Sequence, residues 1–274
     1  MAMKRIEGKM SLDRNANVAT HGHQFALFLP ALSDVIKDEQ AFSVTDTVFV
    51  HRLQHVLRVK IGEAVVLFDD TINVLCTIKE CTKNRVVFAP QSVKKNKQVE
   101  PALTIILPLL KREALEEVIY GCRELGVTQV YLVSTVKSSR HTLRQEECER
   151  LERISIAAAE QSKNFSPCRI MYKNIAGQLP TLKQFLQEQA HNPTFANSLK
   201  YFADVTGQPW SNLVENHLQQ KEHFVICVGP EGDFTNDEKQ KIRESGFIFC
   251  QLGSTILRAQ QAAIVLIGLV RALR

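Results

Sequence analysis

The sequence predicts an α/β protein in which a β-rich N-terminal domain precedes a mostly parallel sheet with helices on both faces. Three observations predict this fold class. Short strand-like runs follow one another closely between residues 24 and 99. After residue 100, apolar strand-like runs alternate with amphipathic helical segments, which is typical of a parallel sheet. A hydrophobic content of 45% is enough to fill the core of such a fold.

The composition excludes several classes of protein. The 274 residues carry a formal net charge of +5, a mildly basic balance that is compatible with nucleic acid binding but does not require it. The seven cysteines are odd in number and contain no C-x-x-C spacing, so we expect neither a disulfide framework nor a zinc or other metal site. A reducing, cytoplasmic environment fits them. The longest apolar stretch, residues 262–270, is far too short to cross a bilayer, so no membrane association is expected.

The N-terminal part divides into a polar extension, residues 1–23, and the β-rich domain, residues 24–99. Several short strands at close intervals in that domain predict a small β barrel. Residues 51–59 have apolar side chains at helical spacing, Val56 among them, which predicts a short amphipathic helix with a basic face. The lysine-rich residues 94–97 predict a linker to the second domain. The predicted strands are residues 25–29, 64–68, 74–79 and 85–89.

Residues 100–274 are expected to form the second domain, in which strands and helices alternate. The helix predicted at residues 111–125 has one apolar stripe that includes Leu115 and Leu125, and Gly126 ends it. The predicted strands are residues 103–107, 127–134, 169–172, 199–204, 224–228 and 247–252. The predicted helices are residues 111–125, 146–161, 181–189, 213–220 and a last helix from about residue 259.

Two glycine turns follow the last two predicted strands, at residues 229–234 and 253–258. Thr235 and Glu238 stand at capping-box spacing, so a helix is expected to begin directly after the first turn. Neither turn is a G-x-G-x-x-G sequence or a P-loop. One such turn alone would be explained as a simple turn. Two turns at equivalent strand ends favour a ligand pocket, because open α/β sheets bind ligands at the carboxyl ends of their strands.

A series of short motifs resembles one known family. The motifs are HVLRV (residues 55–59) with Gly62, CRELGV (122–127), AAAEQS (157–162), GPEG (229–232), LG (252–253) and ILR (256–258). Each motif alone has little specificity, but the series in this order is specific. It resembles the RsmE-type methyltransferases of the SPOUT superfamily, which methylate N3 of a uridine in small-subunit ribosomal RNA. The resemblance covers nearly the whole chain after about residue 24.

This resemblance implies a fold, a cofactor and partners. Residues 24–99 would be a PUA-like, RNA-binding β barrel, and residues 100–274 a SPOUT domain with a C-terminal trefoil knot. The chain would form a homodimer, bind S-adenosylmethionine between three loops, and act on 16S ribosomal RNA in an assembled subunit. The cofactor-binding residues would be Ala203, Asp204, Val228, Gly229, Pro230, Glu231, Gly232, Leu252, Gly253, Ile256 and Leu257.

Arg258 is the candidate catalytic residue, because a cation between cofactor and RNA can stabilise a developing uridine anion or grip a phosphate. A surface arginine at a helix N-terminus is the equally weighted alternative. Glu231 is either a base or a residue that orients its turn through hydrogen bonds, and the second role is favoured. Phosphate contacts are predicted for Arg52, Arg58, Lys137 and Arg140.

Three positions depart from the family pattern. Residues 259–261 read Ala-Gln-Gln where Thr-Glu-Thr is usual, so a carboxylate becomes an amide. Asp233 replaces a second glycine, and Asp tolerates a positive φ less well than Gly. Residues 163–164 read Lys-Asn where an arginine is usual.

Two other functions therefore stay open: a non-catalytic RNA-binding or ribosome-assembly protein on the same scaffold, and an unrelated nucleotide-binding α/β enzyme.

Overall fold

The computed structural model describes residues 3–5, 24–36, 40–138, 140–172, 178–217 and 222–273. Contacts within the chain divide it into two compact units, Met1–Lys97 and Gln98–Arg274. Each unit has its own hydrophobic core and is described by itself. Among the described helices, none combines the length and apolar character that crossing a membrane requires.

The smaller unit is built on one six-stranded sheet with the strand order β1-β3-β6-β5-β4-β2. Neighbouring strands run antiparallel except for β2 and β4, which are parallel. Among the described residues, short helical segments accompany the sheet: α1 (Leu32–Val35), α2 (Thr47–His51) and the π-helix η1 (Arg52–Val56). The strands are β1 (Met3–Arg5), β2 (Phe25–Phe28), β3 (Phe42–Val44), β4 (Ala64–Phe68), β5 (Ile72–Thr82) and β6 (Arg85–Lys95).

Two predictions for this unit are corrected. Lys94 and Lys95 do not belong to a linker, because they extend β6 and pair with residues of β5. Charged residues are tolerated there because both lysines are exposed. The helix predicted at residues 51–59 begins earlier, at Thr47, and its second half is a π-helical turn closed by the Leu57 N–H and the Arg52 carbonyl, 2.9 Å apart. The wider turn leaves Val56 65% exposed instead of on the apolar stripe.

The larger unit contains a six-stranded sheet with the order β12-β10-β11-β7-β8-β9, in which every neighbouring pair is parallel. The predicted α/β class with a mostly parallel sheet is confirmed. From β7 the chain adds β8 and β9 on one side of the sheet and then β10, β11 and β12 on the other. The strand order therefore reverses between β7 and β11, and such sheets bind ligands at this kind of reversal. The strands are β7 (Ala102–Pro108), β8 (Gln129–Val133), β9 (Arg169–Met171), β10 (Leu199–Pro209), β11 (His223–Val228) and β12 (Ile248–Gln251).

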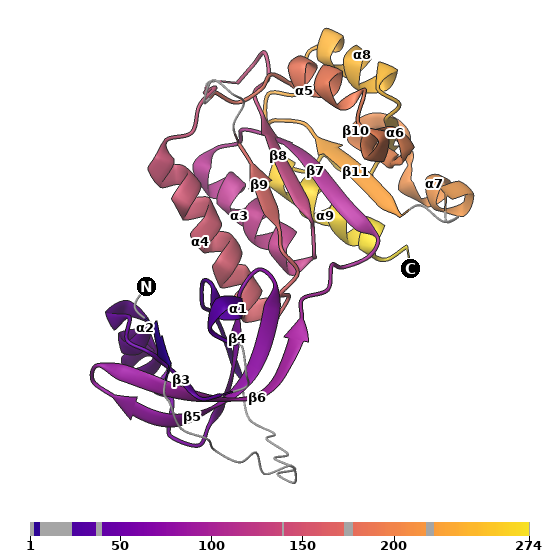
Figure 1. The fold of residues 1–274 in the computed structure, drawn as a ribbon. Coiled ribbons are helices and arrows are strands. Elements are labelled where there is room, and N and C mark those ends of the chain that lie inside the picture. The colour runs from indigo at the N-terminus through magenta and orange to yellow at the C-terminus, as the bar shows by residue number, and fades with distance from the viewer. Residues whose placement is uncertain are drawn as a thin grey trace. The chain divides into compact units, whose positions relative to one another are not determined.

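Helices cover both faces of this sheet (Figure 1). On one face α3 (Arg112–Glu124), α4 (Gln145–Ser162) and α9 (Ala259–Arg271) share a core with alternate residues of the strands. On the other face α5 (Leu182–Gln189), α6 (Pro193–Asn197) and α8 (Asn236–Glu244) pack on the intervening residues. The strand β7 shows this alternation directly, because Ile105 joins the first core and Ile106 joins the second.

Most of the predicted elements of this unit are confirmed, with ends shifted by one to three residues. Thr235 accepts the Glu238 N–H and Glu238 accepts the Thr235 N–H, so α8 begins with the predicted capping box. The helix α6 was not predicted, because five residues are too few to show a helical period. The helix α7 (Trp210–His217) begins three residues before its predicted start, and residues 218–220 of that prediction lie outside the described residues.

The strand β10 continues well past its predicted end at residue 204 and reaches Pro209. Its pairing with β12 shifts between Ala203 and Gln208, so the intervening residues leave the regular ladder and then rejoin it. Gly207 sits at the point of rejoining. A Cβ atom there would lie 2.4 Å from the Cys250 backbone nitrogen and 2.4 Å from the Phe249 carbonyl carbon, so only glycine fits.

Candidate functional site

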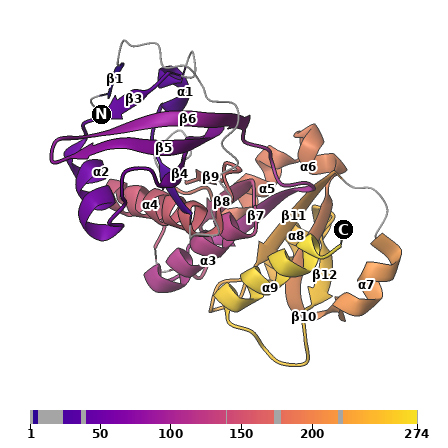
Figure 2. The same cartoon turned by 90° about the horizontal axis from the view of Figure 1, so that it is seen from below.

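The carboxyl ends of β10, β11 and β12 meet at one edge of the sheet because the three strands are parallel neighbours. Residues 203–205 of β10, where its regular pairing with β12 stops, the segments that follow β11 and β12, and the first turns of α3 enclose a cavity of about 740 Å³, which we call the strand-end pocket. The segment between β12 and α9 extends beyond the strands (Figure 2). The two glycine turns therefore lie at the same edge of the sheet, as predicted, because the strands before them run parallel.

Eight residues predicted to bind the cofactor or act in catalysis line this pocket: Ala203, Asp204, Gly229, Pro230, Glu231, Ile256, Leu257 and Arg258. Four others do not line it. Val228 is buried within β11, and Gly232, Leu252 and Gly253 lie in the adjoining turns without lining the cavity. The structure thus brings together residues from three separate stretches of sequence at one site.

Sequence reasoning missed one wall of the pocket. Lys111, Glu113 and Glu117 come from the start of α3, and Lys239 comes from α8. The position of the α3 residues could have been predicted, because α3 follows directly after β7 and so begins at the same edge of the sheet. Glu113 and Glu117 are four residues apart and therefore lie on one face of the helix.

A buried carboxylate joins two of the pocket segments. Asp204 lies within β10, where the pairing with β12 is interrupted, and pairs with Lys239; Lys239 also pairs with Asp233 in the first glycine turn, both at 2.7 Å. The Thr206 hydroxyl and backbone N–H donate to Asp204 at 2.6 and 2.8 Å. Burial acts to raise the pKa of Asp204, but the hydrogen bonds from Lys239 and Thr206 outweigh it and lower that pKa. The Asp204 carboxylate is therefore ionised and fixed.

The first glycine turn is shaped by Asp233, whose φ of 58° lies in the left-handed region. The Asp233 N–H closes the turn on the Pro230 carbonyl at 2.9 Å, and its carboxylate accepts the Phe234 N–H at 2.7 Å. These local bonds explain how an aspartate occupies a conformation that favours glycine. Lys137 donates to the Gly232 carbonyl at 2.8 Å and holds the outside of the turn.

The side chain of Glu238 connects the end of this turn to the segment that follows β8. One carboxylate oxygen accepts the Thr235 N–H and the other accepts the Val136 N–H, each at 2.9 Å. Glu238 is buried, so these bonds are shielded from water. The start of α8 is thereby fixed relative to the segment that follows β8.

Apolar side chains are exposed in the strand-end pocket. Ile256 is 85% exposed and Val205 is 57% exposed, and both line the cavity. Arg258, exposed beside them, is the N-cap residue of α9. Glu231 is also exposed and accepts a long 3.5 Å hydrogen bond from the Lys111 N–H. Apolar surface next to charged and backbone polar groups suits a ligand that has both a flat apolar part and charges.

The predicted RNA contacts fall in both units. Arg52 and Arg58 belong to the smaller unit, in and just after η1. In the larger unit Lys137 bonds the Gly232 carbonyl, and Arg140 pairs with Glu147 at 2.7 Å. Within the described ranges, no group of three or more His, Cys, Asp or Glu side chains is placed to hold a metal ion.

The fold and the pocket define a class: a parallel α/β domain with a cavity at the carboxyl ends of its strands, the edge at which such sheets bind ligands. The profile of the RNA methyltransferase domain family matches residues 97–271, and the chain belongs to this family. The match covers nearly all of the larger unit, including every segment that lines the strand-end pocket.

Individual relatives agree with this assignment. The ribosomal RNA small subunit methyltransferase E of Rickettsia conorii is 30% identical over 226 residues, which is 82% of this chain and 86% of that protein. The Synechocystis protein of the same name is 29% identical over 90% of this chain and 79% of its own length. A ribosomal RNA small subunit methyltransferase E from Neisseria gonorrhoeae, solved bound to S-adenosyl methionine, has a TM-score of 0.74 at 23% identity, covering 92% of this chain and 98% of its own, and shares the fold. The resemblance to RsmE-type methyltransferases is confirmed.

Proposed function

We propose that this protein transfers the methyl group of S-adenosylmethionine to N3 of a specific uridine in small-subunit ribosomal RNA. The observation that carries the proposal is the strand-end pocket, built by three parallel strand ends in a member of the RNA methyltransferase domain family. The relatives named for small-subunit ribosomal RNA methylation support the choice of substrate.

The residues of the pocket fit S-adenosylmethionine, which supplies a methyl group on a positively charged sulfonium. Five acidic side chains line the cavity against three basic ones, so the pocket favours a cationic ligand. The exposed Ile256 and the partly buried Leu257 offer apolar contact to the adenine. The turn at Gly229 and Pro230 exposes backbone groups for the ribose and the base edge. Asp204 and Lys239 keep these walls at a fixed separation.

Arg258 is the residue we assign to the reaction itself. Uracil N3 carries a weakly acidic proton that must leave, and the base must be out of its pair to be reached. An exposed guanidinium at the rim of the pocket stabilises the uridine anion that develops as the N3 proton passes to solvent; N3 then bonds to the methyl carbon as the methyl–sulfur bond breaks and S-adenosylhomocysteine leaves. Gln260 lines the same cavity and cannot serve as the base, because its amide does not accept a proton at neutral pH.

The wider architecture is part of the proposal. Residues 24–99 act as a PUA-like RNA-binding barrel, with Arg52 and Arg58 on RNA phosphates; the extension at residues 1–23 adds the edge strand β1 to its sheet. Residues 100–274 act as the methyltransferase domain, with a trefoil knot at its C-terminal end that places the pocket segments. A homodimer is supported by α9, whose residues 262–270 are all apolar or glycine and include Val265, a large apolar side chain that is 37% exposed. The substrate is the RNA of an assembled small ribosomal subunit. The protein acts in the cytoplasm, a reducing compartment in which free cysteines persist.

The test combines binding and transfer. Small ribosomal subunits from cells that lack this protein are incubated with the purified chain and methyl-labelled S-adenosylmethionine, and the RNA is digested for mass spectrometry. We expect a single N3-methyluridine in small-subunit RNA. Methylation at another atom, or no calorimetric heat with S-adenosylmethionine, would overturn the proposal.

A non-catalytic RNA-binding or ribosome-assembly role is the second candidate. The observation that favours it is Gln260, an amide lining the pocket at a position where the resemblance to RsmE-type methyltransferases predicts a carboxylate. On that hypothesis the cofactor binds and small subunits bind, but no methyl group is transferred to free RNA, to assembled subunits or to partly assembled ones. The incubation described above separates the two roles, because only the first yields labelled RNA.

A further inference from the structure

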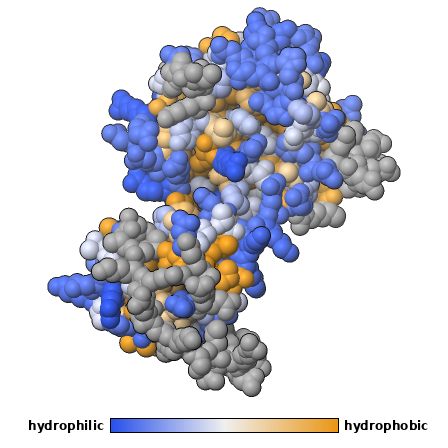
Figure 3. Space-filling model, viewed as in Figure 1, coloured by the Kyte–Doolittle hydropathy of each residue, from blue (hydrophilic) through white to orange (hydrophobic). Residues whose placement is uncertain are grey.

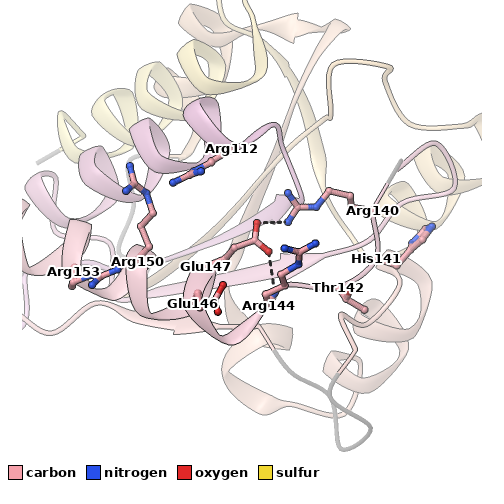
Figure 4. A pocket seen from close by; sticks show the side chains of 9 residues that line it. All are labelled: Arg112, Arg140, His141, Thr142, Arg144, Glu146, Glu147, Arg150 and Arg153. Atoms are coloured by element: carbon pink, nitrogen blue, oxygen red, sulfur yellow. Dashed lines mark hydrogen bonds and ion pairs between the residues drawn. The ribbon is translucent and has the colours of Figure 1, made fainter.

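A second hollow of about 880 Å³ lies beside α3 and is lined mainly by arginines; we call it the arginine pocket (Figure 4). Its cationic residues are Arg112, Arg140, Arg144, Arg150 and Arg153. None of these residues except Arg140 was predicted to be functional. The pocket is formed by α3, α4 and the segment between β8 and α4.

The arginine pocket carries an excess of positive charge. Five arginines face two lining glutamates, Glu146 and Glu147, and Glu116 pairs with two of the arginines, which leaves a formal charge of +2 with His141 neutral. Like charges gathered in one hollow repel one another, and this repulsion is relieved when an anion enters. Figure 3 shows hydrophilic side chains over the start of α4 in the larger unit.

Carboxylates hold some of the guanidinium groups in place without filling the hollow. Glu116 accepts from Arg112 at 2.9 Å and from Arg150 at 2.8 Å, and Glu147 accepts from Arg140 at 2.7 Å. The hydrogen bond from Arg150 is the main cause that lowers the pKa of Glu116 to about 2, so this anchor stays ionised. In the part of the chain that the structure describes, Arg144 and Arg153 form no ion pair within 4 Å, and the hydrogen bond from the Arg144 backbone N–H, with the charge of Arg144 added to it, lowers the pKa of Glu147.

Two long helices begin at the hollow. Arg112 is the first residue of α3, and Arg144 is the N-cap residue of α4. The partial positive charge of each helix N-terminus adds to that of the arginines. The arrangement therefore suits a phosphate-bearing ligand, because planar guanidinium groups bind phosphate oxygens in pairs.

The hollow is a neighbour of the strand-end pocket. Arg112 lines the arginine pocket, while Glu113 and Glu117 on the adjacent face of the same helix line the strand-end pocket. The two sites are thus separated by one helix, about 10 Å in width. RNA whose target uridine enters beside the cofactor in the strand-end pocket therefore passes next to the arginine pocket.

We infer that the arginine pocket binds the phosphate backbone of the ribosomal RNA beside the target uridine, an inference that rests on the proposed function. The contacts are to phosphates, so the pocket positions the RNA and adds affinity without reading its sequence. RNA is favoured over an acidic protein because the site is concave, rich in arginine and next to the pocket where a nucleotide must enter.

The test uses the full chain and small ribosomal subunits from cells that lack it. The variant Arg144→Gln/Arg153→Gln removes two of the five arginines, and the matched control Lys183→Gln/Lys241→Gln removes two exposed charges from α5 and α8 on the other face of the sheet. Filter binding is measured across a series of KCl concentrations. We expect the arginine variant to bind at least about tenfold more weakly, with a salt dependence reduced by about 1.4 in slope, and the control to match the wild type.

Calorimetry with S-adenosylmethionine separates this inference from the proposed function. If the wild type does not bind the cofactor, the proposed function fails. If the cofactor and subunits bind normally but the arginine variant equals the control, the inference alone fails. Tight binding of the wild type to a purified acidic ribosomal protein, lost in the arginine variant while RNA binding is kept, would also overturn it. Arg144→Lys/Arg153→Lys is expected to recover the salt dependence.

Discussion

The strand-end pocket and the arginine pocket lie on two sides of α3 but are built in different ways. The first is formed largely by backbone turns at the ends of parallel strands, with Asp204 and Lys239 as internal ties. The second is formed by long side chains on helix surfaces, held by Glu116 and Glu147. A backbone-built site has a fixed shape, whereas a site of arginine side chains adapts to the path of its ligand.

This difference matches the two tasks that we propose. Methyl transfer requires reacting atoms to be held in line, and a small error in position is costly. Holding an RNA backbone requires charge at several points and tolerates small shifts, because each phosphate presents several acceptor oxygens. Changes in the first site are therefore expected to act on stability and rate, and changes in the second on affinity and salt dependence.

The largest effect is expected from Gly207→Ala, which tests whether backbone packing fixes the strand-end pocket. The new Cβ atom would lie 2.4 Å from the Cys250 nitrogen, and backbone atoms cannot move aside cheaply. We expect a loss of about 3 kcal/mol or more in the free energy of unfolding, measured in urea, and loss of cofactor binding.

Gly253→Ala is the matched control for this variant. Gly253 lies in the segment between β12 and α9, where an added Cβ atom would meet nothing within 4 Å. We expect a change within about 0.5 kcal/mol. Equal losses in the two variants would show that the packing of Gly207 against β12 does not set the stability of the site.

The next effect in size is that of Arg258→Ala. If Arg258 stabilises the uridine anion, methylation of small subunits falls by about 100-fold, while the affinity for S-adenosylmethionine changes by less than about threefold. Single-turnover methyl transfer and calorimetry measure the two quantities. Equal losses in both would assign Arg258 to cofactor binding, and no loss would return it to the surface arginine that its exposed position also allows.

The sequence predicted backbone features of the strand-end pocket well because they are local. The capping box at Thr235 and Glu238 and the turn at residues 229–234 depend on neighbours in sequence, and parallel pairing then brings the turns together. Lys239 and Glu117 could not be found in this way. Their place in the pocket depends on the packing of α8 and α3 against the sheet, which no local pattern encodes.

The arginine pocket shows the same limit more strongly. Arg112, Arg144 and Arg153 have the pattern of ordinary solvated residues of amphipathic helices, and only the packing of α3 beside α4 gathers them. The extension of β10 to Pro209 was missed for a related reason. Gly207 and Pro209 argue against a strand by propensity, and pairing with β12 overrides that preference.

A smaller effect is expected from Lys239→Met, which removes the tie between two walls of the strand-end pocket. Asp204 would keep its bonds from Thr206 but lose its cation while its side chain is only 3% exposed. We expect a loss of about 2 kcal/mol in the free energy of unfolding at pH 7 and weaker cofactor binding. Urea unfolding and calorimetry measure these changes, and Lys241→Met, at an exposed position of α8, is the control.

The pH dependence of this loss gives an independent check. The pKa of Asp204 lies below its usual value of 3.8 in the folded protein, so its ionised form stabilises the fold above that pH. The contribution is lost as the pH falls through the folded pKa. The difference between wild type and Lys239→Met is therefore expected to shrink below about pH 3.8. A difference that stays constant down to about pH 2 would assign the loss to packing alone.

The smallest effect is expected at Asp233, where the resemblance to RsmE-type methyltransferases predicts a glycine. Asp233→Gly relieves the left-handed backbone but removes a partly exposed ion pair with Lys239, so the two changes nearly cancel, within about 0.5 kcal/mol. Asp233→Ala loses the ion pair and keeps the strain, and should cost about 1 kcal/mol. Urea unfolding orders the three proteins. If Asp233→Gly instead raises the rate of methylation by more than about tenfold, the aspartate is a restraint on the reaction, and the turn's side chain, not only its backbone, governs the strand-end pocket.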